Sequence, residues 1–219
     1  MNRGSAVKEA AYYGRPRREM QAFVPAGARR VLDVGCGAGA FLAGLKAARP
    51  GLVAWGIELD PAAAARAASH LDRVLIGDAA AVVPGLAGER FDCIVLNDVL
   101  EHVLEPEQLL ATLRPLVAVG GCVVASVPNI RHFTAVADLV FRGKWEYTDE
   151  GILDRTHLRF FTRASLPGLF AGGGFGLESA TGINRTGSAK FKLFDLLTFG
   201  RFADLGCLQF ACVARPLET

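Results

Sequence analysis

The feature that most constrains this chain is a strand–loop–helix pattern at residues 31–41, which read VLDVGCGAGAF. An apolar run ends at Asp33, and glycines follow at alternate positions before an alanine-rich helical stretch. A strand that enters a tight turn and then a helix N-terminus forms the ligand-binding edge of parallel α/β sheets. The glycine spacing differs from that of dinucleotide-binding loops, and no phosphate-gripping lysine lies nearby. We therefore expect a nucleotide-like ligand that lacks a polyphosphate.

Further apolar segments alternate with helical patterns along the chain, and several of them end in polar residues. The predicted strands after the first are 53–58, 73–76, 91–96, 121–127, 175–182 and 207–214, and the predicted helices lie near 39–49, 61–70, 106–114 and 163–172. This alternation predicts right-handed crossovers and a doubly wound, mostly parallel seven-stranded α/β sheet with helices on both faces. Ligands of such sheets bind beyond the carboxyl ends of the strands.

A family resemblance follows from these segments taken in order. The stretches VLDVGCGAGAF, GIELDP, GDA, FDCIVLNDVLEHV and GGCVVASVPN resemble the successive motifs of class I S-adenosylmethionine-dependent methyltransferases, over roughly residues 31–128. The resemblance implies a Rossmann-like methyltransferase fold, S-adenosyl-L-methionine as cofactor and S-adenosyl-L-homocysteine as product. A narrower similarity over 143–162 is to a bacterial subgroup that often occurs beside glycosyltransferases and other polysaccharide or secondary-metabolite enzymes.

The glycine loop and two acids form the first part of the predicted cofactor site. Gly35, Gly37 and Gly39 let the backbone approach the amino-acid end of the cofactor without a Cβ clash. Asp33 is expected to face the cofactor's ammonium group or to order the loop. Glu58 ends the second strand about 20 residues past the loop, where an acid accepts hydrogen bonds from ribose hydroxyls.

Four more residues complete the predicted cofactor site. By resemblance, Asp78 bonds the adenine amine while Ala79 packs nearby, and the alternative role for Asp78 is a helix N-cap. Asn97 ends the fourth strand and is expected to line the cofactor or methyl-transfer pocket. Arg17, in the N-terminal segment, is also predicted to bind the cofactor.

The predicted catalytic pair is His157 with Asp154. Methyl transfer to a hydroxyl needs an aligned nucleophile and removal of its proton. A histidine beside a carboxylate suits that task near neutral pH. The alternative is that Asp154, Arg155 and His157 only tie their segment to the sheet.

A metal-dependent reading stays open beside this one. Asp98, Glu101 and His102 fall at positions i, i+3 and i+4, so they share a face if a helical turn begins there. This string and the later Thr156-His157 resemble the ubiquinone-biosynthesis O-methyltransferases, which implies a divalent ion that orients a hydroxyl substrate. Asp98 stands where that pattern has a longer glutamate. We therefore predict a site without a metal.

The chain is predicted to form a single domain over 1–219, with a helical preface at 1–29. Segments 129–162 and 190–202 are expected to cover the acceptor site. The first is too polar for a core and too aromatic for a linker, and the second is predicted to be an apolar helix or lid. Within segment 129–162, several aromatic side chains are expected to form a platform on which a flat ring or a sugar binds. The set is Trp145, Tyr147 and Phe160, with Lys144 beside it.

Composition limits the partners and the cellular location that we expect for this chain. A net charge of +2 without a dense basic stripe argues against nucleic acid as a partner. The five cysteines form no Cys-x-x-Cys pair, and no apolar run reaches the length of a membrane span, so a cytoplasmic enzyme, with a homodimer allowed, is expected. The predicted activity is O-methylation of a small-molecule or sugar hydroxyl. The alternatives are N-methylation of an amino sugar or small amine, and a cofactor-binding module without catalysis.

Overall fold

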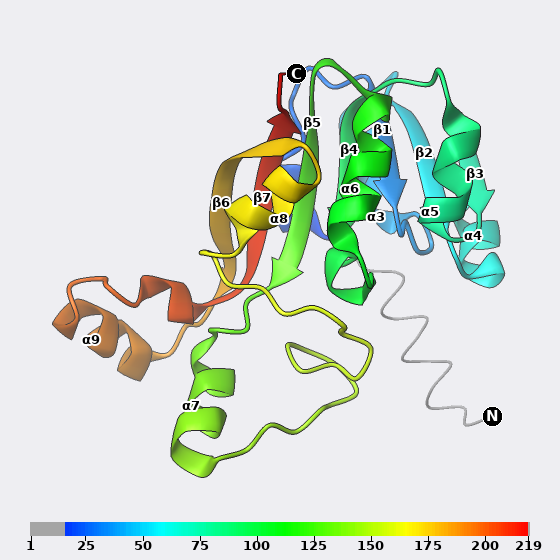
Figure 1. The fold of residues 1–219 in the computed structure, drawn as a ribbon. Coiled ribbons are helices and arrows are strands. Elements are labelled where there is room, and N and C mark those ends of the chain that lie inside the picture. Colours follow the sequence, from blue (N-terminus) through cyan, green and yellow to red (C-terminus); the bar gives the residue numbers. More distant parts are fainter. Residues whose placement is uncertain (1–15, 219) are drawn as a thin grey trace.

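The computed structural model describes residues 16–218 and is built on one seven-stranded sheet of order β3-β2-β1-β4-β5-β7-β6 (Figure 1). The strands are β1 (Arg30–Val34), β2 (Val53–Glu58), β3 (Arg73–Ile76), β4 (Phe91–Asn97), β5 (Val117–Pro128), β6 (Phe175–Arg185) and β7 (Cys207–Pro216). Strands β1 to β5 pair in parallel, whereas β7 runs antiparallel to both β5 and β6. The predicted mostly parallel, seven-stranded α/β fold is confirmed.

Helices lie on both faces of the sheet (Figure 1). They are α2 (Arg18–Gln21), α3 (Ala40–Ala48), α4 (Pro61–Ala67), α5 (Ala79–Val82), α6 (Pro106–Leu113), α7 (Phe133–Arg142), α8 (Leu166–Gly172) and α9 (Ala189–Leu197). Helices α3, α4, α6 and α8 occupy the predicted helical ranges. Helix α7 lies inside segment 129–162, which the sequence predicts to be a long insertion and for which no helix is assigned. Among residues 16–218, no helix is long and apolar enough to cross a membrane.

Strand alternation divides the core into two layers. In β4, Ile94 and Leu96 pack on the face that α6 and α8 cover, whereas Cys93 and Val95 pack on the face that α2 and α3 cover. Successive side chains of a strand point to opposite faces, so a strand buried on both sides has a continuous apolar sequence. The run FDCIVLN has this form because β4 lies at the middle of the sheet.

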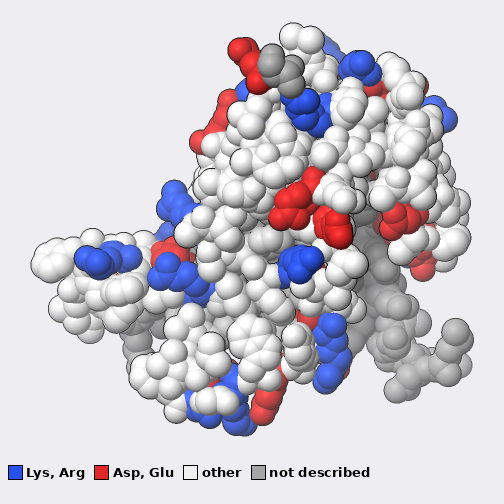
Figure 2. All heavy atoms as spheres, in the orientation of Figure 1, with Lys and Arg blue, Asp and Glu red and all other residues white. Residues whose placement is uncertain are grey.

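The carboxyl ends of β1 to β5 meet at one edge of the sheet, which we call the carboxyl edge. The antiparallel β7 begins at the same edge, since Gln209 pairs with Pro128 at the end of β5. Helices α7 and α9 project from this edge away from the sheet (Figure 1). On the face drawn in Figure 2, positive side chains gather on these two projections. Segments from distant parts of the chain therefore converge on the carboxyl edge.

The predicted preface is described only from residue 16 onward, and residues 1–15 lie outside the described part. Met20 of α2 is fully buried, and the side chain of Gln21 donates to the carbonyl oxygen of Phe41 in α3 at 3.0 Å. These contacts fasten the end of the preface to the helix that follows the glycine loop.

We expect Phe170→Ala to lower the free energy of unfolding by about 3–5 kcal/mol, because the ring of Phe170 is fully buried between α8 and the sheet. Phe141→Ala is the matched control, since the Phe141 side chain is 85% exposed, and it is expected to change stability by less than about 0.5 kcal/mol. Urea unfolding measures both. Equal losses in the two variants would contradict this assignment of the core.

Candidate active site

The loop between β1 and α3 adopts a conformation that its glycines make accessible. Gly35, Gly37 and Gly39 have φ angles of 73°, 55° and 80°, in the left-handed region that side chains disfavour. The N–H groups of Gly35 and Cys36 both donate to the carbonyl oxygen of Ile57, at 2.8 and 3.1 Å. The loop is therefore fastened to the end of β2 and leads directly into the N-terminus of α3.

Glu58 is buried at the end of β2 and holds the glycine loop directly. Its Oε2 accepts a hydrogen bond from the backbone N–H of Gly37 at 2.7 Å, and its Oε1 accepts one from that of Asp60 at 2.9 Å. The side chain is 5% exposed. Each carboxylate oxygen keeps a further lone pair, so Glu58 is still able to accept a hydroxyl bond.

Asp33 lies one strand away and is also buried, at 2% exposure. Burial, followed by the negative charge of Glu58, raises the pKa of Asp33 to about 8, against a smaller opposing effect of Arg17. Its Oδ1 has no hydrogen-bond partner among the described residues. A buried carboxyl group without a partner is costly, and a cationic ligand group beside it removes that cost.

Asp78 and Ala79 follow β3 at the start of α5. Asp78 Oδ1 accepts from the N–H of Ala80 at 2.9 Å, so Asp78 has the N-cap role that the sequence left open as the alternative. The residue is exposed at the carboxyl edge, and the cap uses one of its carboxylate oxygens. Ala79 is half-buried against the core. The capping role and a role toward an adenine amine are thus compatible.

Arg17 meets the end of β4 through a partly buried network centred on Asp98. Its guanidinium forms an ion pair with Asp98 and donates to Ser126 Oγ at 3.1 Å and to Gln209 Oε1 at 3.3 Å. Asp98 Oδ1 also accepts from Ser126 Oγ at 2.8 Å and from Gln209 Nε2 at 2.7 Å. The network joins the preface to β4, β5 and β7 at the carboxyl edge.

Asn97 precedes this network at the last position of β4. Neither its Oδ1 nor its Nδ2 has a partner within residues 16–218, although both atoms are buried. An unpaired buried amide calls for a ligand or a water molecule. The structure places Asn97 at the last position of β4, and its role in lining a pocket stays a prediction.

Glu101, His102 and His157 form a cluster next to these residues. One ligand atom from each lies within 4.8 Å of the others. Glu101 is fully buried, and neither of its carboxylate oxygens has a partner in the described chain. Burial, together with the charge of Asp98, raises the pKa of Glu101 well above its ordinary value. Sequence reasoning considered Glu101 only as a metal ligand.

Both histidines of the cluster are oriented by backbone carbonyl groups. His157 Nδ1 is 2.9 Å from the carbonyl oxygen of Ile152, and His102 Nδ1 is 3.2 Å from that of Thr156. A carbonyl oxygen only accepts, so in each ring Nδ1 carries the hydrogen and Nε2 keeps its lone pair. The two rings lie 4.9 Å apart. Each Nε2 thus keeps a lone pair, in a cluster where one ligand atom of each histidine lies within 4.8 Å of one of Glu101.

Asp154 does not orient His157 through its side chain. Its Oδ1 accepts from the N–H and the hydroxyl of Thr156, at 2.8 and 2.6 Å, while its backbone carbonyl accepts from the N–H of His157. Although burial opposes it, the two bonds from Thr156 hold the pKa of Asp154 below its ordinary value. Asp154 thus shapes the turn that carries His157 and supplies negative charge nearby.

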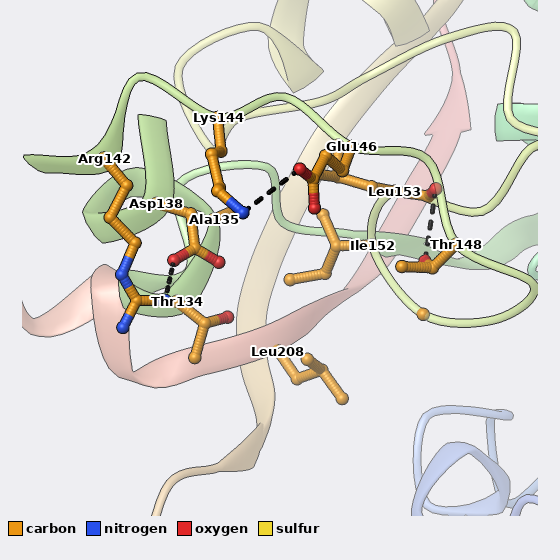
Figure 3. A pocket seen from close by; sticks show the side chains of 11 residues that line it. Thr134, Ala135, Asp138, Arg142, Lys144, Glu146, Thr148, Ile152, Leu153 and Leu208 are labelled. Carbon is orange, nitrogen blue, oxygen red and sulfur yellow. Dashed lines mark hydrogen bonds and ion pairs between the residues drawn. The ribbon is translucent and has the colours of Figure 1, made fainter. Parts of the chain in front are cut away.

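A pocket of about 390 Å³ opens beside this turn, between α7 and residues 144–153 (Figure 3). Its lining includes Ile152 and Leu208 together with the charged residues Asp138, Arg142, Lys144 and Glu146. In Figure 3 Lys144 points toward Glu146, and the two form an ion pair of 3.2 Å. Ile152 lines the pocket and also accepts from His157, so the pocket adjoins the histidine cluster.

The fold is Rossmann-like, and its glycine loop and several polar side chains gather at the carboxyl edge, where ligands of such sheets bind. Residues 8–180 match the family model described as a methyltransferase domain, and the chain belongs to that family. The family confirms the class of enzyme and the cofactor, S-adenosylmethionine, that the motifs predict.

Individual relatives show how far the similarity extends. The chain is 30% identical over 132 residues to a ubiquinone biosynthesis O-methyltransferase of Cereibacter sphaeroides, and it spans about half the length of that relative, 52%. An uncharacterized methyltransferase of Mycobacterium bovis is 33% identical over 143 residues, which are 59% of this chain and 71% of the relative.

Solved structures share the fold at lower identity. A methyltransferase from Archaeoglobus fulgidus gives a TM-score of 0.63 at 19% identity over 94% of this chain and 93% of its own. A calicheamicin-biosynthesis methyltransferase, solved with S-adenosylhomocysteine bound, gives 0.57 at 20% identity over 97% of this chain and 55% of its own.

We expect Glu58→Ala to weaken S-adenosylhomocysteine binding by about 1–3 kcal/mol, because the variant loses a charged acceptor that also holds the loop at Gly37. Glu58→Gln keeps one acceptor oxygen and is expected to lose less. Isothermal titration measures the affinities. Glu178→Ala is the control, since Glu178 is an exposed acid on β6, and unchanged affinity in both Glu58 variants would contradict the assignment.

The raised pKa of Asp33 predicts that stability and S-adenosylhomocysteine affinity both depend on pH. Its folded pKa is raised, so the stability it contributes to the ligand-free protein is lost as pH rises through about 8. An ammonium group beside Asp33 favours the ionised form. The dissociation constant for S-adenosylhomocysteine should therefore fall several-fold per unit from about pH 6 to about 8.

The control for this dependence is Asp33→Asn, which keeps the shape of the side chain and removes its titration. Titrations at several pH values compare it with the unchanged protein. The same slope in both proteins would show that Asp33 does not face the cofactor's ammonium group.

Proposed function

We propose that this protein transfers a methyl group from S-adenosylmethionine to the hydroxyl group of a small molecule or sugar. The proposal rests on the cluster of Glu101, His102 and His157. This cluster lies at the carboxyl edge of the sheet, where the glycine loop also lies. A hydroxyl must lose its proton as it attacks the methyl group, and the cluster supplies groups suited to that task. The Cereibacter relative is named an O-methyltransferase, which supports the same acceptor atom.

The cofactor would lie along the ends of β1, β2 and β3. In this proposal Glu58 accepts from the ribose hydroxyls, and Asp78 and Ala79 meet the adenine ring. Asp33 faces the ammonium group, and Arg17, held at the same edge by Asp98, meets the cofactor's carboxylate. The left-handed glycines leave room for the amino-acid end of the cofactor.

His157 would act as the general base. Its Nδ1 hydrogen is committed to Ile152, which leaves the Nε2 lone pair to accept the proton of the acceptor hydroxyl. A carboxyl oxygen of Glu101 lies within 4.8 Å of a ring nitrogen of His157, and in this role Glu101 stabilises the imidazolium that forms. Asp154 adds negative charge and fixes the turn through Thr156.

The second candidate mechanism uses a divalent ion to activate the acceptor hydroxyl, and the geometry of the cluster supports it. Glu101, His102 and His157 would hold the ion, since both histidines donate their Nδ1 hydrogens to carbonyl groups, as metal-bound histidines commonly do. Asp98 is engaged by Arg17, Ser126 and Gln209. When bound, such an ion lowers the pKa of a ligated hydroxyl.

We further propose that 1–219 is one catalytic domain in which segments 129–162 and 190–202 cover the acceptor. The ends of the first segment are joined, because Ile130 donates to the carbonyl oxygen of Phe161 at 3.0 Å. Within it the ring of Phe160 lies 5.4 Å from Trp145 and 6.4 Å from His157. This line of rings, with the pocket of Figure 3 beside it, suits a flat ring or sugar and fits the polysaccharide or secondary-metabolite role that the sequence suggested.

The test follows labelled methyl transfer to a panel of phenols, catechols and monosaccharides. We expect His157→Ala to lower kcat by roughly 10²–10⁴-fold with unchanged S-adenosylhomocysteine affinity, because proton removal acts on the transition state. His70→Ala is the matched control, since His70 is an exposed residue after α4, and it should keep full activity.

Two further measurements separate the base from the ion. With His157 as base, a chelator has no effect and His102→Ala costs much less than His157→Ala. Loss of activity with chelator, its return with a divalent ion, and equal damage from both substitutions would assign the ion instead. Near-normal kcat in His157→Ala without any chelator effect would contradict both mechanisms, and cofactor binding without transfer to any acceptor would favour a binding module.

A further inference from the structure

The α9 arm, defined as residues 186–202, presents an apolar face to solvent. Leu193, Leu196 and Leu197 stand at helical positions i, i+3 and i+4, and they are 58%, 73% and 69% exposed. Phe199, in the turn after the helix, is 98% exposed. Residues so spaced lie on one side of a helix. A grouped set of large apolar side chains in water marks an interaction surface.

The opposite side of the arm is anchored. Phe191 is 9% exposed, and its ring lies 5.7 Å from that of Phe133 in α7 and 6.1 Å from that of Phe194. A Cβ atom at Gly206 would come within 2.4 Å of the Phe191 ring, so glycine is what lets this ring lie against the chain. Ser188 caps the helix by accepting from the N–H of Phe191. The exposed leucines are therefore presented by a packed element.

The arm is also basic. It contains Lys190, Lys192 and Arg201 against one acid, Asp195, so its net charge of +2 equals that of the whole chain. Asp195 is half-buried, whereas Lys192 and Arg201 are exposed. Figure 2 shows positive side chains on this projection. Exposed leucines and an aromatic ring flanked by lysine and arginine are the composition of helices that lie in the interface of anionic bilayers.

We propose that the α9 arm docks onto the surface of an anionic lipid bilayer, with the leucines and Phe199 entering the interface and the basic side chains meeting the headgroups. Contact between two copies of the arm would bring like charges together, which disfavours self-association through this face. Docking is measured without cofactor or acceptor, so it stands apart from the proposed methyl transfer.

The test is co-sedimentation with phosphatidylcholine vesicles, with and without phosphatidylglycerol. We expect binding to the anionic vesicles, much weaker binding to the neutral ones, and release by salt. The double variant Leu196→Glu/Phe199→Glu should lower the bound fraction about tenfold. Val119→Glu is the matched control, because Val119 is a fully exposed apolar residue near the start of β5, at the opposite end of the strand from the carboxyl edge, and it should bind as the unchanged protein does.

A second pair, Lys192→Ala/Arg201→Ala, leaves the apolar face intact and should weaken binding to anionic vesicles alone. Circular dichroism confirms folding of each variant. Failure of the unchanged protein to bind anionic vesicles would overturn the proposal. So would equal binding by both double variants and the control, or a dimer in solution that Leu196→Glu/Phe199→Glu disrupts when no vesicle binding is seen.

Discussion

One partly buried carboxylate, Asp98, joins four parts of the chain that are far apart in sequence. It binds Arg17 from the preface, Ser126 from β5 and Gln209 from β7, and it follows directly on β4. A buried charge is tolerated only when it is paired and hydrogen-bonded, so these partners hold one another in place. The backbone of Asp98 is left-handed, at φ 55°, and the chain turns there toward Glu101 and His102. The position of the histidine cluster thus depends on this network.

Unpaired polar atoms lie along the same edge of the sheet. Asp33, Asn97 and Glu101 each bury side-chain atoms that have no partner among the described residues. Well-folded chains seldom leave such atoms unpaired, because each costs free energy that the fold must supply. Their positions at the ends of β1 and β4, and just beyond β4, coincide with the places where a cofactor and its acceptor would meet. The cost is understandable if a ligand completes their hydrogen bonds.

The positions of the residues proposed to bind the cofactor could be predicted from the sequence, whereas the contacts of the proposed catalytic residues could not. Asp33, Glu58 and Asn97 end apolar strands, and parallel pairing brings such ends together whatever the rest of the chain does. The contacts of Asp154 could not be predicted, because its carboxylate accepts from Thr156 while the His157 ring is held by the carbonyl oxygen of Ile152. Helix α7 was not predicted either. None of its residues is buried, so this helix lacks the core-facing apolar stripe by which helices are usually recognised in a sequence.

The sequence by itself determined the order of strands and helices, the glycine loop and the acid that holds it, because each depends on local pattern and on short crossovers between neighbours. Only the tertiary structure decided that Arg17 meets Asp98, that β7 runs antiparallel between β5 and β6, and that His157 reaches Glu101. These pairings join residues tens of positions apart. Their choice depends on which buried polar groups satisfy one another once the sheet has formed, and no local pattern encodes that choice.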